Sequence, residues 1–135
     1  MTSRTKLPDD RSGKTVKVQL YSDKQDVFKC YLTVNTYEDG TPGEVFLNIG
    51  KEGDLVHGFA QAWATSLSMM FQYGVPYDHI YGKFKGHMFE PSGFTGRPER
   101  LICRSIVDAV ICYLESNFPP TCKECKDDYE RILNS

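Results

Sequence analysis

The sequence predicts an α+β domain in which an antiparallel sheet of three or more strands carries two long helices on one face. Alternating apolar and polar residues fill positions 14 to 49, and helical periodicity dominates after them. At 135 residues with a formal net charge of −2, the chain fits one domain and lacks the basic excess of non-specific DNA or RNA binders. We expect a flexible segment over residues 1–13, the domain over 14–118 and a polar tail over 119–135.

Three alternating segments predict the strands, and they read "KTVKVQLY", "DVFKCYLTVNTY" and "EVFLNIG". Between the second and the third lies "EDGTPG", which has the Asp-Gly chemistry of a tight turn. One face of the sheet is predicted to be core: Val16, Val18, Leu20, Phe28, Cys30, Leu32, Val34, Val45, Leu47 and Ile49. The other face would carry Tyr31, Thr33, Tyr37 and Phe46, which is apolar enough that we expect a homo-oligomer to form through it.

The first long helix is predicted over residues 55–73, with Asp54 as its N-cap and Gly74 at its end. A short helix opens at Pro76. The second long helix is predicted to start at Pro98 and to end near Asn117, because proline favours the first helical position. The buried stripes would be Leu55, Phe59, Trp63, Leu67, Met70 and Phe71 in the first long helix, and Ile102, Ile106, Ala109, Val110 and Tyr113 in the second.

The chain has no apolar run near the roughly 18 residues of a membrane helix, and its N-terminus has no apolar leader. We therefore expect a cytoplasmic protein, in the host cytoplasm if a phage encodes it. Three of the five cysteines lie in apolar periodic segments, and we expect Cys30, Cys103 and Cys112 to be buried thiols.

The irregular stretch "GHMFEPSGFTGRPER", residues 86–100, is the main candidate for a ligand site. A helix starting at Pro98 would place it against backbone N–H groups that attract anions. Hydroxyl groups, cationic side chains and two phenylalanines for stacking a base suggest a phosphate-plus-base pocket. Its candidate residues are Lys83, Lys85, His87, Phe89, Ser92, Phe94, Thr95, Arg97, Arg100 and Arg104. In the alternative interpretation, the phenylalanines fill the core and the arginines are solvated.

Two further motifs carry weaker signals. The turn "GKEGD" joins a strand to a helix and is a second candidate phosphate cradle, but it lacks the Walker spacing. The "TCKEC" motif, with Cys122 and Cys125, fits an idle reduced pair, a redox pair, or half of a zinc site shared between chains. The three histidines lack metal spacing and no nucleophile motif surrounds a serine, so we expect no enzymatic activity from this chain alone.

Four segments resemble successive motifs of one family: "YEDGTPGEVFLNIGKEGD", "QYGVP", "KFKGHMFEPSGFTG" and "RSIVDAV". They are similar to the TSCPD domain near the C-terminus of adenosylcobalamin-dependent (class II) ribonucleotide reductases, over roughly residues 15 to 118. The resemblance implies a stand-alone copy without the catalytic barrel, and therefore without its radical chemistry. Two departures are Met88, where the family pattern suggests an arginine, and a tail with a single CxxC.

The resemblance leaves three functional hypotheses. The first is a non-catalytic nucleotide-binding or docking module that serves a ribonucleotide reductase subunit. The second is a phage-type sponge that sequesters a cyclic nucleotide or a cyclic ADP-ribose-like immune signal. The third is a structural oligomerisation module whose loop fills an interface.

Overall fold

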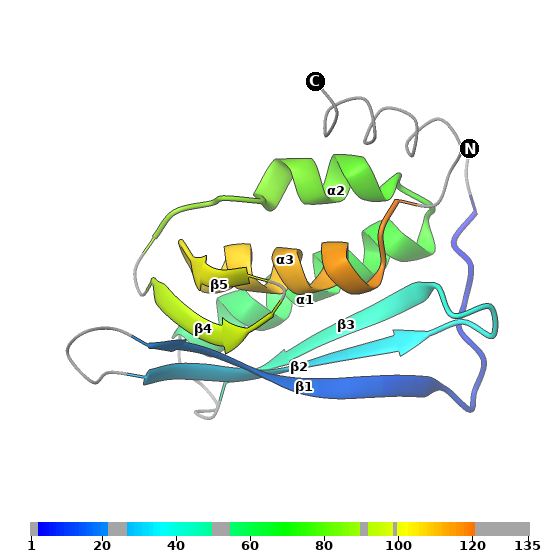
Figure 1. Ribbon diagram of the computed structural model, residues 1–135. Helices are drawn as coiled ribbons and strands as arrows, with labels where there is room; N and C mark the ends of the chain where they lie inside the picture. The colour runs from blue at the N-terminus through cyan, green and yellow to red at the C-terminus, as the bar shows by residue number, and fades with distance from the viewer. Residues whose placement is uncertain (1–2, 22–26, 50–54, 90–91, 99, 121–135) are drawn as a thin grey trace, which may run out of the picture.

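The computed structural model describes residues 3–21, 27–49, 55–89, 92–98 and 100–120. The five strands and three helices of these residues confirm the predicted α+β class (Figure 1). In chain order they are β1 (Ser12–Tyr21), β2 (Val27–Thr36), β3 (Pro42–Asn48), α1 (Leu55–Gln72), α2 (Tyr77–Phe84), β4 (Gly93–Arg97), β5 (Arg100–Cys103) and α3 (Ile106–Asn117). Figure 1 shows all three helices on one side of the sheet, and α2 lies farther from the sheet than α1 and α3 do.

The sheet has the order β3-β2-β1-β4-β5, and all neighbouring strands are antiparallel. Strands β1 and β2 pair along their whole lengths, from Ser12 opposite Thr36 to Tyr21 opposite Val27. The turn between β2 and β3 closes as predicted, because Gly40 takes a φ of 86°, a conformation that favours glycine.

The alternating strand pattern builds the core that the sequence predicts. Val18, Leu32 and Val45 are each at most 2% exposed. Leu67 of α1 and Leu114 of α3 pack against the same cluster, and both are 0% exposed. The sheet and two helices therefore enclose one continuous core. None of the helices among the described residues is long and apolar enough to cross a membrane.

The prediction of the buried face is wrong for the first turns of helix α1. Leu55 and Phe59, predicted as core, are 73% and 69% exposed, whereas His57 is 7% exposed. The reason is the position of α1 along β3, the last strand of the sheet, whose outer backbone groups need hydrogen-bond partners. The His57 Nδ1 atom lies 3.1 Å from the carbonyl oxygen of Ile49.

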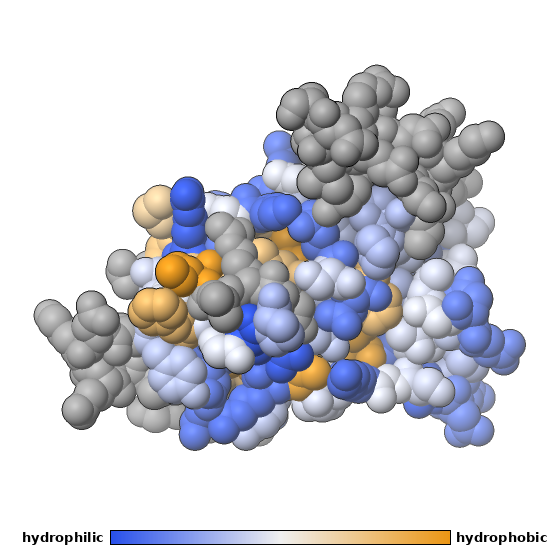
Figure 2. Space-filling model, viewed as in Figure 1, coloured by the Kyte–Doolittle hydropathy of each residue, from blue (hydrophilic) through white to orange (hydrophobic). Residues whose placement is uncertain are grey.

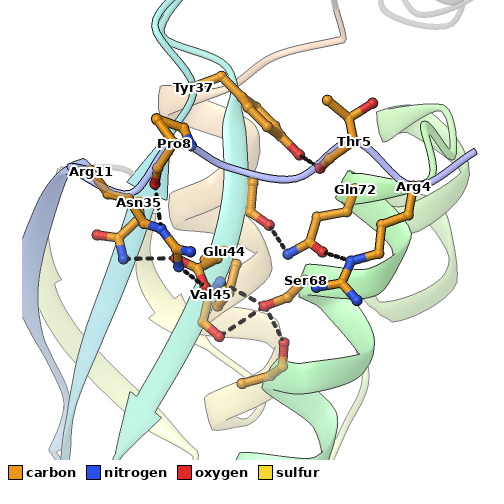
Figure 3. Close-up of polar contacts among 12 residues, drawn as sticks. Arg4, Thr5, Pro8, Arg11, Asn35, Tyr37, Glu44, Val45, Ser68 and Gln72 are labelled. Atoms are coloured by element: carbon orange, nitrogen blue, oxygen red, sulfur yellow. Dashed lines mark hydrogen bonds and ion pairs between the residues drawn. The ribbon is translucent and has the colours of Figure 1, made fainter.

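Two more polar side chains of α1 close the same edge (Figure 3). The Ser68 hydroxyl accepts the N–H of Val45 at 2.8 Å and lies 3.1 Å from its carbonyl oxygen. Gln72 is buried, and its Nε2 atom donates to the carbonyl oxygen of Gly43 at 2.9 Å. Backbone groups of β3 that would otherwise be available to another strand are thus satisfied by the helix.

The residues before β1 lie against this end of the domain (Figure 3). Thr5 donates its N–H to the carbonyl oxygen of Gln72 at 2.9 Å and accepts the Tyr37 hydroxyl at 2.6 Å. Arg11 forms an ion pair of 2.5 Å with Glu44 of β3. These contacts attach part of the segment predicted as flexible. They also correct the place of Tyr37, which lies beyond β2 and points to Thr5 instead of the outer sheet face.

The three thiols predicted to be buried, those of Cys30, Cys103 and Cys112, are all at most 5% exposed. Burial raises the pKa of the Cys30 thiol to about 12, because an apolar environment disfavours the thiolate. The predicted Asp54 cap, the "GKEGD" cradle and the Cys122–Cys125 pair lie outside the described residues.

Candidate functional site

The predicted helix start at Pro98 is wrong, because the chain forms a β-hairpin there. Strands β4 and β5 pair with Phe94 opposite Ile102 and Arg97 opposite Arg100, and Pro98 lies in the turn between them. The register shifts between Phe94 and Arg97, where Gly96 takes a φ of 70°. Proline fits such a turn as well as it fits a helix start.

Helix α3 begins eight residues later than predicted, at Ile106. Its N-cap is Ser105, whose hydroxyl accepts the N–H of Asp108 at 3.1 Å. The loop therefore does not rest against the α3 N-terminus in the predicted way. Arg97, Arg100 and Arg104 do not share a helical face, and Ile102 is 56% exposed on β5 instead of lying in a helical core stripe.

Two of the predicted ligand residues face the interior of the domain. Thr95 is 6% exposed, and its hydroxyl accepts the N–H of Arg97 at 3.0 Å. The guanidinium carbon of Arg97 lies 5.3 Å from the ring centroid of Tyr113 on α3, a cation–π distance. The half-buried Arg97 thus fastens the hairpin to the helix. The side chain of Arg100 lies outside the described residues.

The exposed candidates gather where the loop after α2 meets the turn before α3. His87 and Phe89 form an edge-on ring pair with centroids 5.7 Å apart. The N–H of Phe89 donates to the carbonyl oxygen of Arg104 at 3.3 Å, so the exposed Arg104 lies beside this pair. Lys83 is also exposed, and Lys85 forms an ion pair of 2.6 Å with Glu115 of α3. Ser92 is half-buried, and Phe94 is 55% exposed on the hairpin.

The anchor of this region is a pair of residues outside the predicted site, Ser105 and Asp108, both 0% exposed. The Asp108 carboxylate accepts the N–H of Gly86 at 2.7 Å and that of Arg104 at 2.9 Å. The Ser105 hydroxyl donates to the carbonyl oxygen of His87. A serine followed three residues later by an acid before an apolar run is a helix-start signal, and it identifies both residues in the sequence.

The cavity at the β4–β5 hairpin is too small for a nucleotide. The cavity beside the hairpin, bordered by Thr95, Arg97 and Tyr113, holds about 10 Å³, which is room for one water molecule. A groove of about 720 Å³ lies at the other end of the domain, between the N-terminal segment, the β2–β3 turn and the end of α1. Of the predicted ligand residues, Lys83 borders a separate pocket of about 520 Å³ between α1 and α2.

The hairpin instead contributes to a row of exposed apolar side chains on the outer sheet face. Tyr21 lies opposite Phe94, and Phe94 lies opposite Ile102, so the three point to the same side. They are 39%, 55% and 56% exposed. We call these three residues the apolar ladder. Figure 2 shows apolar residues at the surface over this end of the molecule, where β4 and β5 lie.

The outer face continues across β2 and β3 with two of the residues predicted there. Tyr31 and Phe46 are 45% and 51% exposed. Lys17 lies opposite Tyr31, and Lys29 lies opposite Gln19, so exposed basic residues separate the aromatic ones. No helix of the described residues covers this face (Figure 1). Exposed aromatic side chains are enriched at protein–protein contact surfaces, whereas lysines are more common outside them.

Comparison with known proteins identifies the family. The family model described as "TSCPD domain" matches residues 3–118. The chain belongs to the TSCPD domain family. No solved structure matches it.

Three similar proteins are each named vitamin B12-dependent ribonucleotide reductase. The one from Rhodopirellula baltica is 37% identical over 115 residues, that from Streptantibioticus cattleyicolor 35% over 117, and that from Bradyrhizobium diazoefficiens 36% over 111. These matches cover 85%, 87% and 82% of this chain but only 11%, 19% and 8% of the relatives. The TSCPD domain is thus a small part of each reductase.

Proposed function

We propose that this TSCPD domain is a non-catalytic docking module that contacts a ribonucleotide reductase through its outer sheet face. The observation that carries the proposal is the apolar ladder of Tyr21, Phe94 and Ile102, which is exposed on a face that no described helix covers. Two exposed aromatic residues and one isoleucine, in register across three strands, offer a large apolar contact area.

The relatives suggest which partner this face contacts. In each of the three reductases the matching region is at most 19% of the chain. A domain of that kind has a much larger polypeptide as its neighbour, and its exposed apolar face is suited to pack against that neighbour. Lys17 and Lys29 on the same face favour a partner surface with an acidic rim.

The docking proposal can be tested with the R. baltica reductase produced without its TSCPD region and checked for folding by circular dichroism. Phe94→Asp in this chain should weaken binding at least tenfold, because it places a charge at the centre of an apolar contact. Phe59→Asp is the matched control, since Phe59 is 69% exposed on α1, away from the outer face. Equal affinity of the two variants, measured by isothermal titration calorimetry, would contradict the proposal.

Nucleotide binding is the second candidate function, and the group around Arg104 favours it. The backbone of the exposed residue Arg104 is hydrogen-bonded to Phe89 of the His87–Phe89 ring pair, and Lys83 is exposed on the same segment of the chain. Cations and flat rings on an open surface suit a phosphate and a base. In this proposal the ligand would lie across the α2–β4 loop, outside the 10 Å³ cavity.

A thermal-shift screen separates the nucleotide hypotheses. A ligand present at 100 times its Kd stabilises the fold by about 2.7 kcal/mol. A rise in Tm with deoxynucleoside triphosphates would support a nucleotide-binding module of a ribonucleotide reductase. A rise only with cyclic nucleotides or ADP-ribose derivatives would support a protein that sequesters such signal molecules. Arg104→Ala should abolish the rise. No shift with any of these ligands would favour docking or oligomerisation.

A further inference from the structure

We propose that Cys103, Asp108 and Cys112 form a binding site for one Zn²⁺ ion. Within the described part of the chain, these three side chains each offer a ligand atom, and the three atoms lie within 4.8 Å of one another. All three residues are buried, at 1%, 0% and 5% exposure. The site shares no residue with the exposed loop or the outer sheet face.

The fold brings the three ligands together through local structure. Cys103 is the last residue of β5, and the Ser105 cap directs the chain into α3 immediately after it. Asp108 and Cys112 are four residues apart on α3, so they share one face of the helix. The Cys112 Sγ atom lies 3.7 Å from Asp108 Oδ1.

The donor set matches zinc in both chemistry and spacing. Two thiolates and a carboxylate are ligands that Zn²⁺ binds in tetrahedral sites. With Zn–S bonds of about 2.3 Å, tetrahedral ligand atoms lie about 3.8 Å apart. The three ligand atoms lie at most 4.8 Å from one another, so each pair would have to approach by no more than about 1 Å to bind the ion. The ion would replace the thiol proton between Cys112 and Asp108.

The surroundings of Asp108 hold its carboxylate in place. Backbone N–H groups of Gly86 and Arg104 donate to its two oxygens at 2.7 and 2.9 Å. Hydrogen bonds of this kind orient the ligands of metal sites. The carboxylate therefore needs no large rearrangement to bind an ion.

The cavity beside the thiols provides the fourth position. It holds about 10 Å³, and Cys103 and Cys112 both border it, so one water molecule can complete a tetrahedron. Binding releases two thiol protons to the solvent, which leaves a site with one net negative charge: two thiolates, one carboxylate and Zn²⁺. Arg97 borders the same cavity, and the positive charge of its guanidinium group offsets that negative charge.

The test uses the full chain carrying Cys122→Ser and Cys125→Ser, so that the tail thiols cannot bind metal. Chelator-treated protein is titrated with Zn²⁺, and bound zinc is measured by elemental mass spectrometry after desalting. Co²⁺ in place of Zn²⁺ should give thiolate-to-cobalt charge-transfer absorption. We expect one ion per chain. Absence of any bound zinc or cobalt in this folded background would overturn the proposal.

Three alanine variants in that background locate the ion. Cys103→Ala and Cys112→Ala should each weaken Zn²⁺ binding by at least about 100-fold, since loss of an outer partner alone costs 10- to 100-fold. Cys30→Ala removes an equally buried thiol outside the cluster and should leave binding unchanged. Equal affinity of all three variants would overturn the proposal. If the two ligand variants do not fold, an anomalous-scattering peak between Cys103 and Cys112 in crystals of the zinc-loaded background supports it, and a peak elsewhere refutes it.

Discussion

The two edges of the sheet differ in whether other parts of the domain cover them. At the β3 edge, Ser68 and Gln72 of α1 satisfy backbone groups of the strand, and the N-terminal segment binds the same helix. At the β4–β5 end, Phe94 and Ile102 remain more than half exposed. The contacts at the first end stabilise the fold, and in our proposal the second end is the surface that a partner covers. Loss of Ser68 or Gln72 should therefore reduce stability, whereas loss of the exposed Phe94 should reduce binding to the proposed partner.

The largest expected effect concerns Asp108, which holds the loop after α2 against α3. Asp108→Ala should lower the free energy of unfolding by about 3 kcal/mol or more, because the buried N–H groups of Gly86 and Arg104 lose their acceptor. Urea denaturation of chelator-treated protein measures it. Asp10→Ala, at an exposed position, is the control and should change stability by less than about 0.5 kcal/mol. A similar small change at both positions would show that the anchor does not stabilise the fold.

A second prediction tests the closed β3 edge. Ser68→Ala should destabilise the protein by about 1–2 kcal/mol, because the Val45 N–H loses its partner. Ser66 is the matched control: it donates to the carbonyl oxygen four residues earlier, as Ser68 does, but it is exposed. Ser66→Ala should be close to neutral. If the two variants have equal unfolding midpoints in urea, the helix does not protect this edge.

A third prediction is a pH dependence from Cys30 of β2, which has no effect near neutral pH. Burial raises its pKa from 9.0 to about 12, so the folded state keeps a proton that the unfolded state releases. The contribution of this thiol to stability is complete below about pH 9 and decreases as the pH rises toward 12. Between these values the unfolding free energy should fall more steeply in the wild type than in Cys30→Val. Parallel pH profiles of the two proteins would contradict this assignment.

The sequence predicted the buried face of β1, β2 and β3 better than it predicted the buried faces of the helices. Strand alternation identifies Val18, Leu32 and Val45 as core without tertiary information, because one residue in two faces inward. The exposure of Leu55 and Phe59 could not be predicted in this way. It depends on α1 lying beside an edge strand, where polar side chains are more useful than apolar ones.

The candidate site was predicted only in part, because two local signals compete around Pro98. Proline is common both at helix starts and in turns, and the helix interpretation placed three arginines on one face. The Ser105–Asp108 spacing marks the true helix start. Of the predicted residues, His87, Phe89 and Arg104 do lie together. The inward positions of Thr95 and Arg97 follow from hairpin register, which depends on pairing with β1 and β5.

Hydrogen–deuterium exchange with and without the reductase partner tests the central claim most directly. If the outer face at the apolar ladder is the docking surface, added partner should slow amide exchange in β4 and β5 and at the end of β1 around Tyr21. Exchange in β3 and α1, already closed by Ser68 and Gln72, should not change. Protection confined to β3 and α1, or no protection at all, would contradict the account.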